Sequence, residues 1–214
     1  MASARLQVVP APAVIDHDRF ADSIELALCE RERAIRQAIA HLRADARPLA
    51  HAAALIVGAL HRGGKVLTAG NGGSAAEAQH LAAELVGRFM RDRAALPALA
   101  LTADTAVLTA IANDYGYEAV FARQIEAWGA AGDAIVLFST SGESPNILAA
   151  AAVARSRDIG VVAVTGGAPS RLAAAADVTL AVDSDDTPVV QEMHVVLLHL
   201  LCELVEAECG EGRS

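Results

Sequence analysis

The chain has 214 residues, 54% of them hydrophobic, and a formal net charge of −9 at pH 7. This length suits one α/β domain with its own core and is short for two. The negative charge, without a cluster of Lys and Arg, argues against a nucleic-acid surface. Residues 195–205 are the best candidate for a membrane span, but His199 and Glu203 interrupt them and they fall short of the roughly 20 apolar residues required.

The N-terminal residues and the cysteines favour a cytoplasmic protein. Residues 1–20 contain a short apolar patch broken by prolines and soon followed by acids, which does not fit a secretory signal. Cys29, Cys202 and Cys209 are an odd number without metal-ligand spacing and lie in helical stretches. This pattern is typical of reduced thiols.

Two helices are expected before the first strand. Apolar residues at helical spacing predict one long amphipathic helix from Asp16 to about Arg43, which packs on the sheet or on another subunit. These apolar residues are Phe20, Ile24, Leu28, Ile35, Ile39 and Leu42. A second helix, Pro48 to about His61, is apolar nearly all round and ends at Gly63-Gly64, as a buried helix would.

Five short apolar runs follow, separated by helical segments. They span residues 65–69, 98–102, 134–139, 161–165 and 178–182. Strands that alternate with helices predict right-handed βαβ crossovers and a mainly parallel sheet with helices on both faces. We therefore expect an α/β three-layer sandwich with a five-stranded parallel, flavodoxin-like sheet. The expected organisation is a single domain with N-terminal helices (1–62), a sheet core (63–186) and a C-terminal helix (187–209).

The first strand leads through a glycine-rich turn into a helix. Gly70, Gly72 and Gly73 lack a Cβ, so an anion can approach the backbone N–H groups there. Ser74 followed by Glu77 has the pattern of a capping box, which predicts a helix start at Ser74 with its positive end toward the turn. The alternative is an ordinary turn between a strand and a helix.

On the helix after this turn, His80 and Glu84 are four residues apart and share one face, about one turn beyond the proposed anion site. The alternative is a solvated surface pair. Polar residues gather after the third strand as well, in the segment Ser139-Thr140-Ser141-Gly142-Glu143-Ser144-Pro145. Ser144 is expected to cap the next helix, with Pro145 as its first residue. The remaining hydroxyls and backbone amides predict a phosphate site.

Two further segments carry candidate residues. Asn113 and Asp114 end a helix in a turn, and an ordinary turn role for Asp114 remains open. The last helix is expected to have Thr187 as its cap and Pro188 as its first residue. Gln191 and His199 share a face of this helix, whereas His194 lies roughly 140° around from His199 and is left out of the site. The alternative for His199 is a core histidine bonded to a backbone carbonyl.

Taken together, several of these segments resemble the sugar isomerase (SIS) family, which binds phosphosugars. They are GNGGS with His80 and Glu84, the AND-Y-G segment at 112–116, STSGES at 139–144, and QEMH at 191–194 continuing to His199. The resemblance covers essentially the whole chain. It implies an aldose-ketose isomerase of bacterial heptose biosynthesis that converts sedoheptulose 7-phosphate to D-glycero-D-manno-heptose 7-phosphate. It also implies a homotetramer with sites at subunit interfaces.

The resemblance further implies roles for individual positions. Glu84 and His199 match the family's proposed acid/base pair. One zinc ion per subunit would be bound by His80, Glu84, Gln191 and His199. Substrate would be bound by Asn71, Gly72, Gly73, Ser74, Arg88, Asn113, Asp114, Ser139, Thr140, Ser141, Ser144 and Gln191.

The chain departs from the family pattern at one position and leaves other functions open. Pro188 stands where isomerases often have a polar residue, so any catalytic help from there is missing or comes from Asp185 or Asp186. A non-catalytic relative that binds a replication initiator lacks counterparts of Glu84 and His199. A dinucleotide-dependent oxidoreductase is a further alternative, because residues 70–75 fit the loose G-x-G-x-x-G/A pattern. The substrate could also be another phosphosugar.

Overall fold

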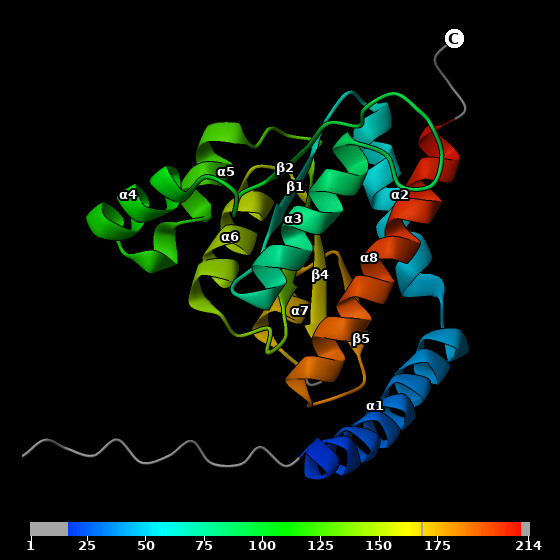
Figure 1. Ribbon diagram of the computed structural model, residues 1–214. Coiled ribbons are helices and arrows are strands. Elements are labelled where there is room, and N and C mark those ends of the chain that lie inside the picture. The colour runs from blue at the N-terminus through cyan, green and yellow to red at the C-terminus, as the bar shows by residue number, and fades with distance from the viewer. Residues whose placement is uncertain (1–16, 168, 211–214) are drawn as a thin grey trace, which may run out of the picture. The chain divides into compact units, whose positions relative to one another are not determined.

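The computed structural model describes residues 17–167 and 169–210 (Figure 1). Its core is a five-stranded, fully parallel sheet with the strand order β2-β1-β3-β4-β5. The strands are β1 (Val66–Ala69), β2 (Ala98–Ala100), β3 (Ala134–Ser139), β4 (Gly160–Gly166) and β5 (Val178–Val182). The predicted three-layer α/β fold is confirmed. The strand order reverses between β1 and β3, which puts the switch point of the sheet at the carboxyl ends of these two strands.

Helices cover both faces of the sheet. On one face, α2 (Arg47–His61), α3 (Gly73–Val86) and α8 (Thr187–Cys209) pack against side chains such as Val136 and Phe138. On the other face, α4 (Thr105–Tyr115), α5 (Ala122–Trp128), α6 (Pro145–Ser156) and α7 (Arg171–Ala175) pack around Ile135 and Leu137, with a 3-10 turn η1 (Tyr117–Ala119) after α4. Alternate residues of β3 thus face opposite layers, as a strand requires.

Helix α8 lies in the core beside α2 and α3 (Figure 1). Among the described residues it is the one helix long and apolar enough to cross a membrane by length and composition, with a mean hydropathy of 1.4 in its most apolar window. Met193, Leu197 and Leu201 are fully buried against the sheet layer. The apolar composition of α8 is therefore that of a core helix.

Helix α1 (His17–Ala44) has the predicted amphipathic character. The chain divides into two compact units at residues 33 and 34, so the two parts of α1 are described separately. In residues 34–44, Ala38 is 2% exposed, and Ile35 and Leu42 pack on the core. In residues 17–33, Phe20, Ile24 and Leu28 are exposed.

The predicted starts of the two helices that carry the candidate site need correction, and α2 begins at Arg47, one residue before its predicted start. Helix α3 begins at Gly73 and not at Ser74, with Gly72 as its cap at φ 57° and no side-chain capping bond. The predicted Ser74–Glu77 capping box is wrong, because Glu77 turns inward and its Oε2 lies 3.2 Å from His194 Nδ1 on α8. Helix α8 begins one residue earlier than predicted, with Asp186 as its cap.

Candidate active site

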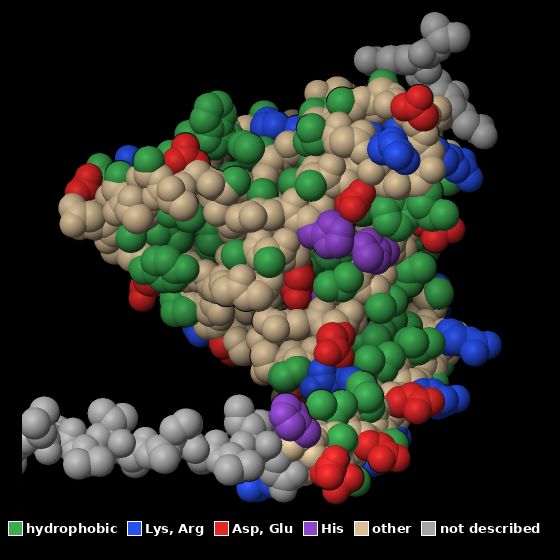
Figure 2. All heavy atoms as spheres, in the orientation of Figure 1, with side chains coloured by type: hydrophobic (Ala, Val, Ile, Leu, Met, Phe, Trp, Pro, Cys, Tyr) green, Lys and Arg blue, Asp and Glu red, His purple; other side chains and the backbone are tan. Residues whose placement is uncertain are grey.

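Helices α3 and α8 bring three predicted side chains together. His80 Nε2 lies 3.1 Å from Glu84 Oε1 and 3.4 Å from His199 Nε2. The two imidazole rings meet edge to face, with centroids 5.0 Å apart. The side chains of His80 and Glu84 are 38% and 24% exposed, so a ligand can reach them. Figure 2 shows histidine and acidic side chains meeting on the surface over α3 and α8.

The start of α8 reaches the start of α3 through Gln191. A Cβ atom on Gly73 would lie 2.4 Å from Gln191 Nε2, which is too close for any two heavy atoms that are not bonded. Only glycine at this position lets the Gln191 amide lie against the first turn of α3. Glycine is required at position 73 because a side chain would collide with Gln191, and not because the backbone there has a positive φ.

The serine-rich segment forms a compact loop at the carboxyl end of β3. Ser139 Oγ accepts a hydrogen bond from the Gly142 N–H at 3.1 Å and lies 3.4 Å from Ser144 Oγ. Ser144 precedes α6 as predicted, although its side chain makes no capping bond. Thr140 is half-buried and Ser141 is exposed. The loop therefore presents hydroxyls and backbone N–H groups at the N-terminus of a twelve-residue helix, an arrangement that suits an anion.

A pair of asparagines joins this loop to the glycine-rich turn. Asn71 Nδ2 donates to Asn146 Oδ1 at 2.9 Å, and Asn146 Nδ2 donates back to Asn71 Oδ1 at 2.8 Å. The Tyr117 hydroxyl also donates to Asn71 Oδ1, at 2.9 Å. Asn146 is 2% exposed, whereas Asn71 is half-buried, so the pair lies at the edge of the interior. The two predicted anion-binding segments are thus adjacent at the switch point of the sheet.

Other predicted site residues lie at the surface or beneath it. Arg88 is exposed in the loop that follows α3. Asn113 and Asp114 are exposed at the end of α4, where Asn113 Nδ2 donates to Asp114 Oδ1 at 2.8 Å. Ser74 is 4% exposed and offers little surface to a ligand.

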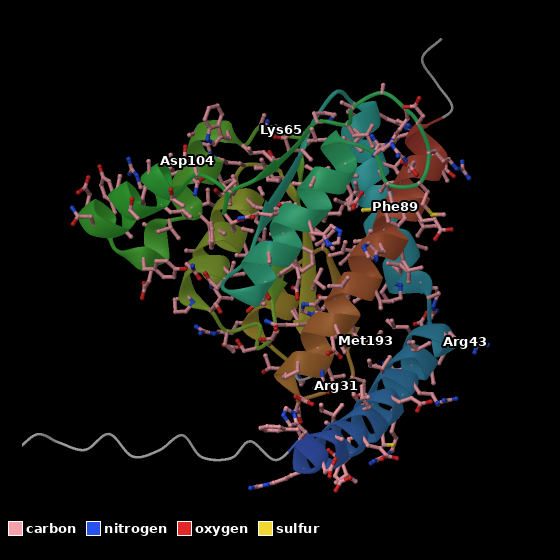
Figure 3. The ribbon with its side chains drawn as sticks, viewed as in Figure 1. Arg31, Arg43, Lys65, Phe89, Asp104 and Met193 are labelled. Atoms are coloured by element: carbon pink, nitrogen blue, oxygen red, sulfur yellow. The ribbon has the colours of Figure 1, made fainter. Side chains whose placement is uncertain are left out.

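Three residues around the site were missed by sequence reasoning. Asn146 and Tyr117 hold Asn71, and Phe89 stacks on His199 with ring centroids 5.3 Å apart and an angle of 25° between the planes. Figure 3 shows Phe89 beside α8. Asn146 could have been identified from the sequence, because it is a polar residue that follows Pro145 directly at the start of a mostly apolar helix. No local pattern marked Phe89 or Tyr117.

A thiol lies near the site but is not a nucleophile. Burial, together with the negative charge of Glu84, raises the pKa of Cys202 to about 12. A thiol with this pKa stays protonated at neutral pH and behaves as a small apolar side chain. The reactive groups that remain are the carboxylate of Glu84 and the two imidazoles.

These side chains are of types that bind zinc, and two of them have a spacing that suits it. Zn–N bonds of about 2.0–2.1 Å in a tetrahedron place two nitrogen ligands roughly 3.4 Å apart. The Nε2 atoms of His80 and His199 have this separation, 3.4 Å. Within residues 17–167 and 169–210, no group of three or more His, Cys, Asp and Glu side chains is already arranged to hold a metal ion. The fourth donor of the predicted set, Gln191, is an amide on α8.

Comparisons with known proteins show the family of the chain. The SIS domain model matches residues 32–166. The chain is 49% identical to a phosphoheptose isomerase of Helicobacter hepaticus over 75% of this chain and 82% of the relative. It is also 49% identical to one of Burkholderia pseudomallei, over 85% and 90%. The structure of phosphoheptose isomerase GmhA from Neisseria gonorrhoeae superposes with a TM-score of 0.80 at 41% identity, covering 88% of this chain and 99% of that one.

The family model covers β1 to β4 and α3 but ends before α8, whereas the superposed structure covers 88% of this chain. The chain belongs to the SIS domain family and, within it, to the phosphoheptose isomerases, which are aldose-ketose isomerases.

Proposed function

We propose that the protein converts sedoheptulose 7-phosphate to D-glycero-D-manno-heptose 7-phosphate. The observation that carries this proposal is the cluster of Glu84, His80 and His199. Two helices from distant parts of the chain place His80 Nε2 3.1 Å from the Glu84 carboxylate and 3.4 Å from His199 Nε2. The names of the relatives support the choice of a heptose phosphate. We further propose that the enzyme serves heptose biosynthesis in the cytoplasm.

The substrate phosphate would be bound by the loop of residues 139–144. Its hydroxyls and the free N–H groups at the start of α6 bind an anion without a lysine. The pairing of Asn71 with Asn146 keeps the glycine-rich turn against this loop. The backbone N–H groups of Gly72 and Gly73 would contribute from that side, and Asn71 would contact the sugar.

The chemistry requires a base at C1 and a group that moves protons between the two oxygens. Glu84 would take the proton from C1 of the ketose, which leaves an enediolate. His199 would move the hydroxyl proton between O1 and O2, and Glu84 would return its proton to C2. No atom is gained or lost in the sequence, so product and substrate are isomers.

Zinc is proposed as the cofactor, held by His80, Glu84, Gln191 and His199. When bound, the ion would act as a Lewis acid that stabilises negative charge on the two oxygens. The contacts among these side chains position the groups of the site. His80 holds the Glu84 carboxylate and faces His199, and the missing Cβ of Gly73 leaves room for the Gln191 amide.

We also propose a homotetramer with sites at subunit interfaces. Arg88, Asn113 and Asp114 support this assignment, because all three are exposed in the single chain. A neighbouring subunit would bring such residues to a site, or bury them beside one. Sedimentation or light scattering of the purified protein measures the assembly directly.

The function is tested by following sedoheptulose 7-phosphate with the purified protein in heavy water by NMR. The expected result is a new aldose phosphate that carries solvent deuterium at C2. Parallel samples with a chelator, and with zinc added back, report whether turnover requires the metal. Absence of any aldose product in all samples would exclude the isomerase proposal and favour a non-catalytic binding role.

A further inference from the structure

A buried carboxylate near the end of α8 holds the loop that follows α3. Glu206 is 2% exposed, and its oxygens accept hydrogen bonds from the backbone N–H groups of Phe89 at 3.0 Å, Met90 at 2.8 Å and Arg91 at 2.8 Å. Burial alone would raise the pKa of Glu206, but these N–H groups and the charge of Arg93 outweigh it, so the pKa lies below its ordinary value. The carboxylate is therefore ionised at neutral pH.

Arg93, at the other end of the same loop, contacts both Glu206 and the backbone of α3. Its Nε atom lies 3.2 Å from Glu206 Oε1, and its side chain is 2% exposed. Its terminal nitrogens donate to the backbone carbonyls of Glu84 at 2.7 Å and Leu85 at 2.9 Å. The loop is thus attached both to α8 and to the turn of α3 that carries Glu84.

The anchored loop carries the ring that packs on His199. Phe89 donates its backbone N–H to Glu206, and its side chain stacks on the His199 imidazole with centroids 5.3 Å apart. His80 meets the same imidazole edge to face at 5.0 Å. The orientation of the His199 ring is therefore limited by Phe89 and by His80.

We propose that Glu206 is a positioning residue for His199. By holding residues 89–91, it keeps the Phe89 ring against the imidazole and directs Nε2 toward His80 and the reacting sugar. This role rests on the isomerase function proposed above. The phosphate would be bound by residues 72–73 and 139–144, on other elements, and of the proposed substrate-binding residues only Arg88 lies in this loop. Loss of the anchor therefore acts on turnover more than on substrate affinity.

The first test changes the stacked ring and leaves Glu206 in place. Phe89→Leu keeps an apolar side chain but removes the flat surface, whereas Phe89→Tyr keeps it. We expect Phe89→Leu to lower kcat by about ten-fold or more, since misplacement of a catalytic group by an ångström can cost about 100-fold. KM should stay within about two-fold, because the phosphate site is untouched. Phe89→Tyr should restore most of kcat.

The second test removes the charge of the anchor. Glu206→Gln places an amide N–H₂ where backbone N–H donors point, so hydrogen exchange at the amides of Phe89, Met90 and Arg91 should accelerate. The matched control is Asp133→Asn. Asp133 is also a buried carboxylate, 3% exposed, that accepts N–H bonds from Lys65 at 2.9 Å and Ala130 at 2.8 Å, but it lies at the amino ends of β1 and β3. The control should lose comparable thermal stability and keep its kcat.

The outcomes separate this proposal from the function on which it rests. Full kcat in Phe89→Leu, or a loss that Phe89→Tyr does not restore, would overturn the positioning role. So would unchanged exchange at residues 89–91 in Glu206→Gln, or an equal fall of kcat in Asp133→Asn. A wild-type protein without isomerase activity would instead overturn the proposed function, while the exchange experiment would still show whether Glu206 holds the loop.

Discussion

His80 and His199 lie 119 residues apart in the sequence, and their Nε2 atoms are 3.4 Å apart in the structure. One imidazole comes from α3 and the other from α8, and Glu84 contacts His80 from one helical turn further along α3. The cluster therefore depends on the packing of two helices and not on a local motif.

Replacing Glu84 with Gln should remove the proposed base and keep its shape. We expect turnover to fall by a factor on the order of 10² to 10⁴, with KM nearly unchanged. Steady-state kinetics with sedoheptulose 7-phosphate measures both constants. Glu203→Gln, at an exposed position on the same helix as His199, serves as the control and should behave as wild type. Unchanged turnover in Glu84→Gln would remove this residue from the mechanism.

Chelation should remove zinc, turnover and some thermal stability together. A ligand that binds only the folded state stabilises it by about 2.7 kcal/mol at 100 times its dissociation constant, so the melting temperature should rise again when zinc is restored. His80→Ala should bind much less zinc, measured by elemental analysis after dialysis. Equal zinc content in His80→Ala and wild type would argue against this imidazole as a ligand.

Gly73→Ala should displace the Gln191 side chain. The added Cβ would lie 2.4 Å from Gln191 Nε2, so the amide or the first turn of α3 must move. We expect zinc affinity or activity to fall by about 10- to 100-fold, the range for disturbed metal-site partners. Gly58→Ala on α2 is the control, because its Cβ meets the end of Arg62, a side chain outside the candidate site. Wild-type activity in Gly73→Ala would show that the position of Gln191 is not needed.

Asn146→Ala should weaken substrate binding through Asn71. The change removes both bonds that Asn146 makes with the Asn71 amide and leaves that amide less restrained. Loss of a buried polar partner typically costs about 1–3 kcal/mol, so we expect a lower melting temperature and a raised KM. Tyr117→Phe removes the remaining bond to Asn71 and should raise KM by a smaller factor. If KM stays constant in both variants, Asn71 does not contact the sugar.

The contribution of Glu206 to stability should depend on pH. Its pKa is lowered in the folded protein from an ordinary value of 4.5, so the stabilisation is present above that pH and is lost as pH falls through the folded value. Glu206→Gln should therefore be less stable than wild type at pH 7, and the difference should shrink in acid. Urea unfolding at pH 7 and at acid pH measures it. A difference that grows in acid would contradict this sign.

The central strands β1, β3 and β4 could be predicted closely because each is a short, buried apolar run, whereas the edge strand β2 ends at Ala100, two residues before its predicted end. The starts of α3 and α8 were less predictable. The Ser74–Glu77 pattern is locally a good capping box, but Glu77 has a partner 117 residues away that no local rule contains. The same holds for Asn71 with Asn146 and for Phe89 with His199. The sequence identifies polar residues suited to a site, whereas their pairing is decided by which helices the sheet places side by side.

The contact between Glu77 and His194 has a consequence for the alignment of the two helices. It lies one turn before His80 on α3 and between Gln191 and His199 on α8, in an interior where His194 is fully buried and its Nε2 has no hydrogen-bond partner. Sliding one helix along the other by a single turn, about 5.4 Å, would break the only bond that this imidazole makes among the described residues. The same slide would carry His80 out of reach of His199. The interior pair thus fixes the axial register in which the surface cluster can assemble.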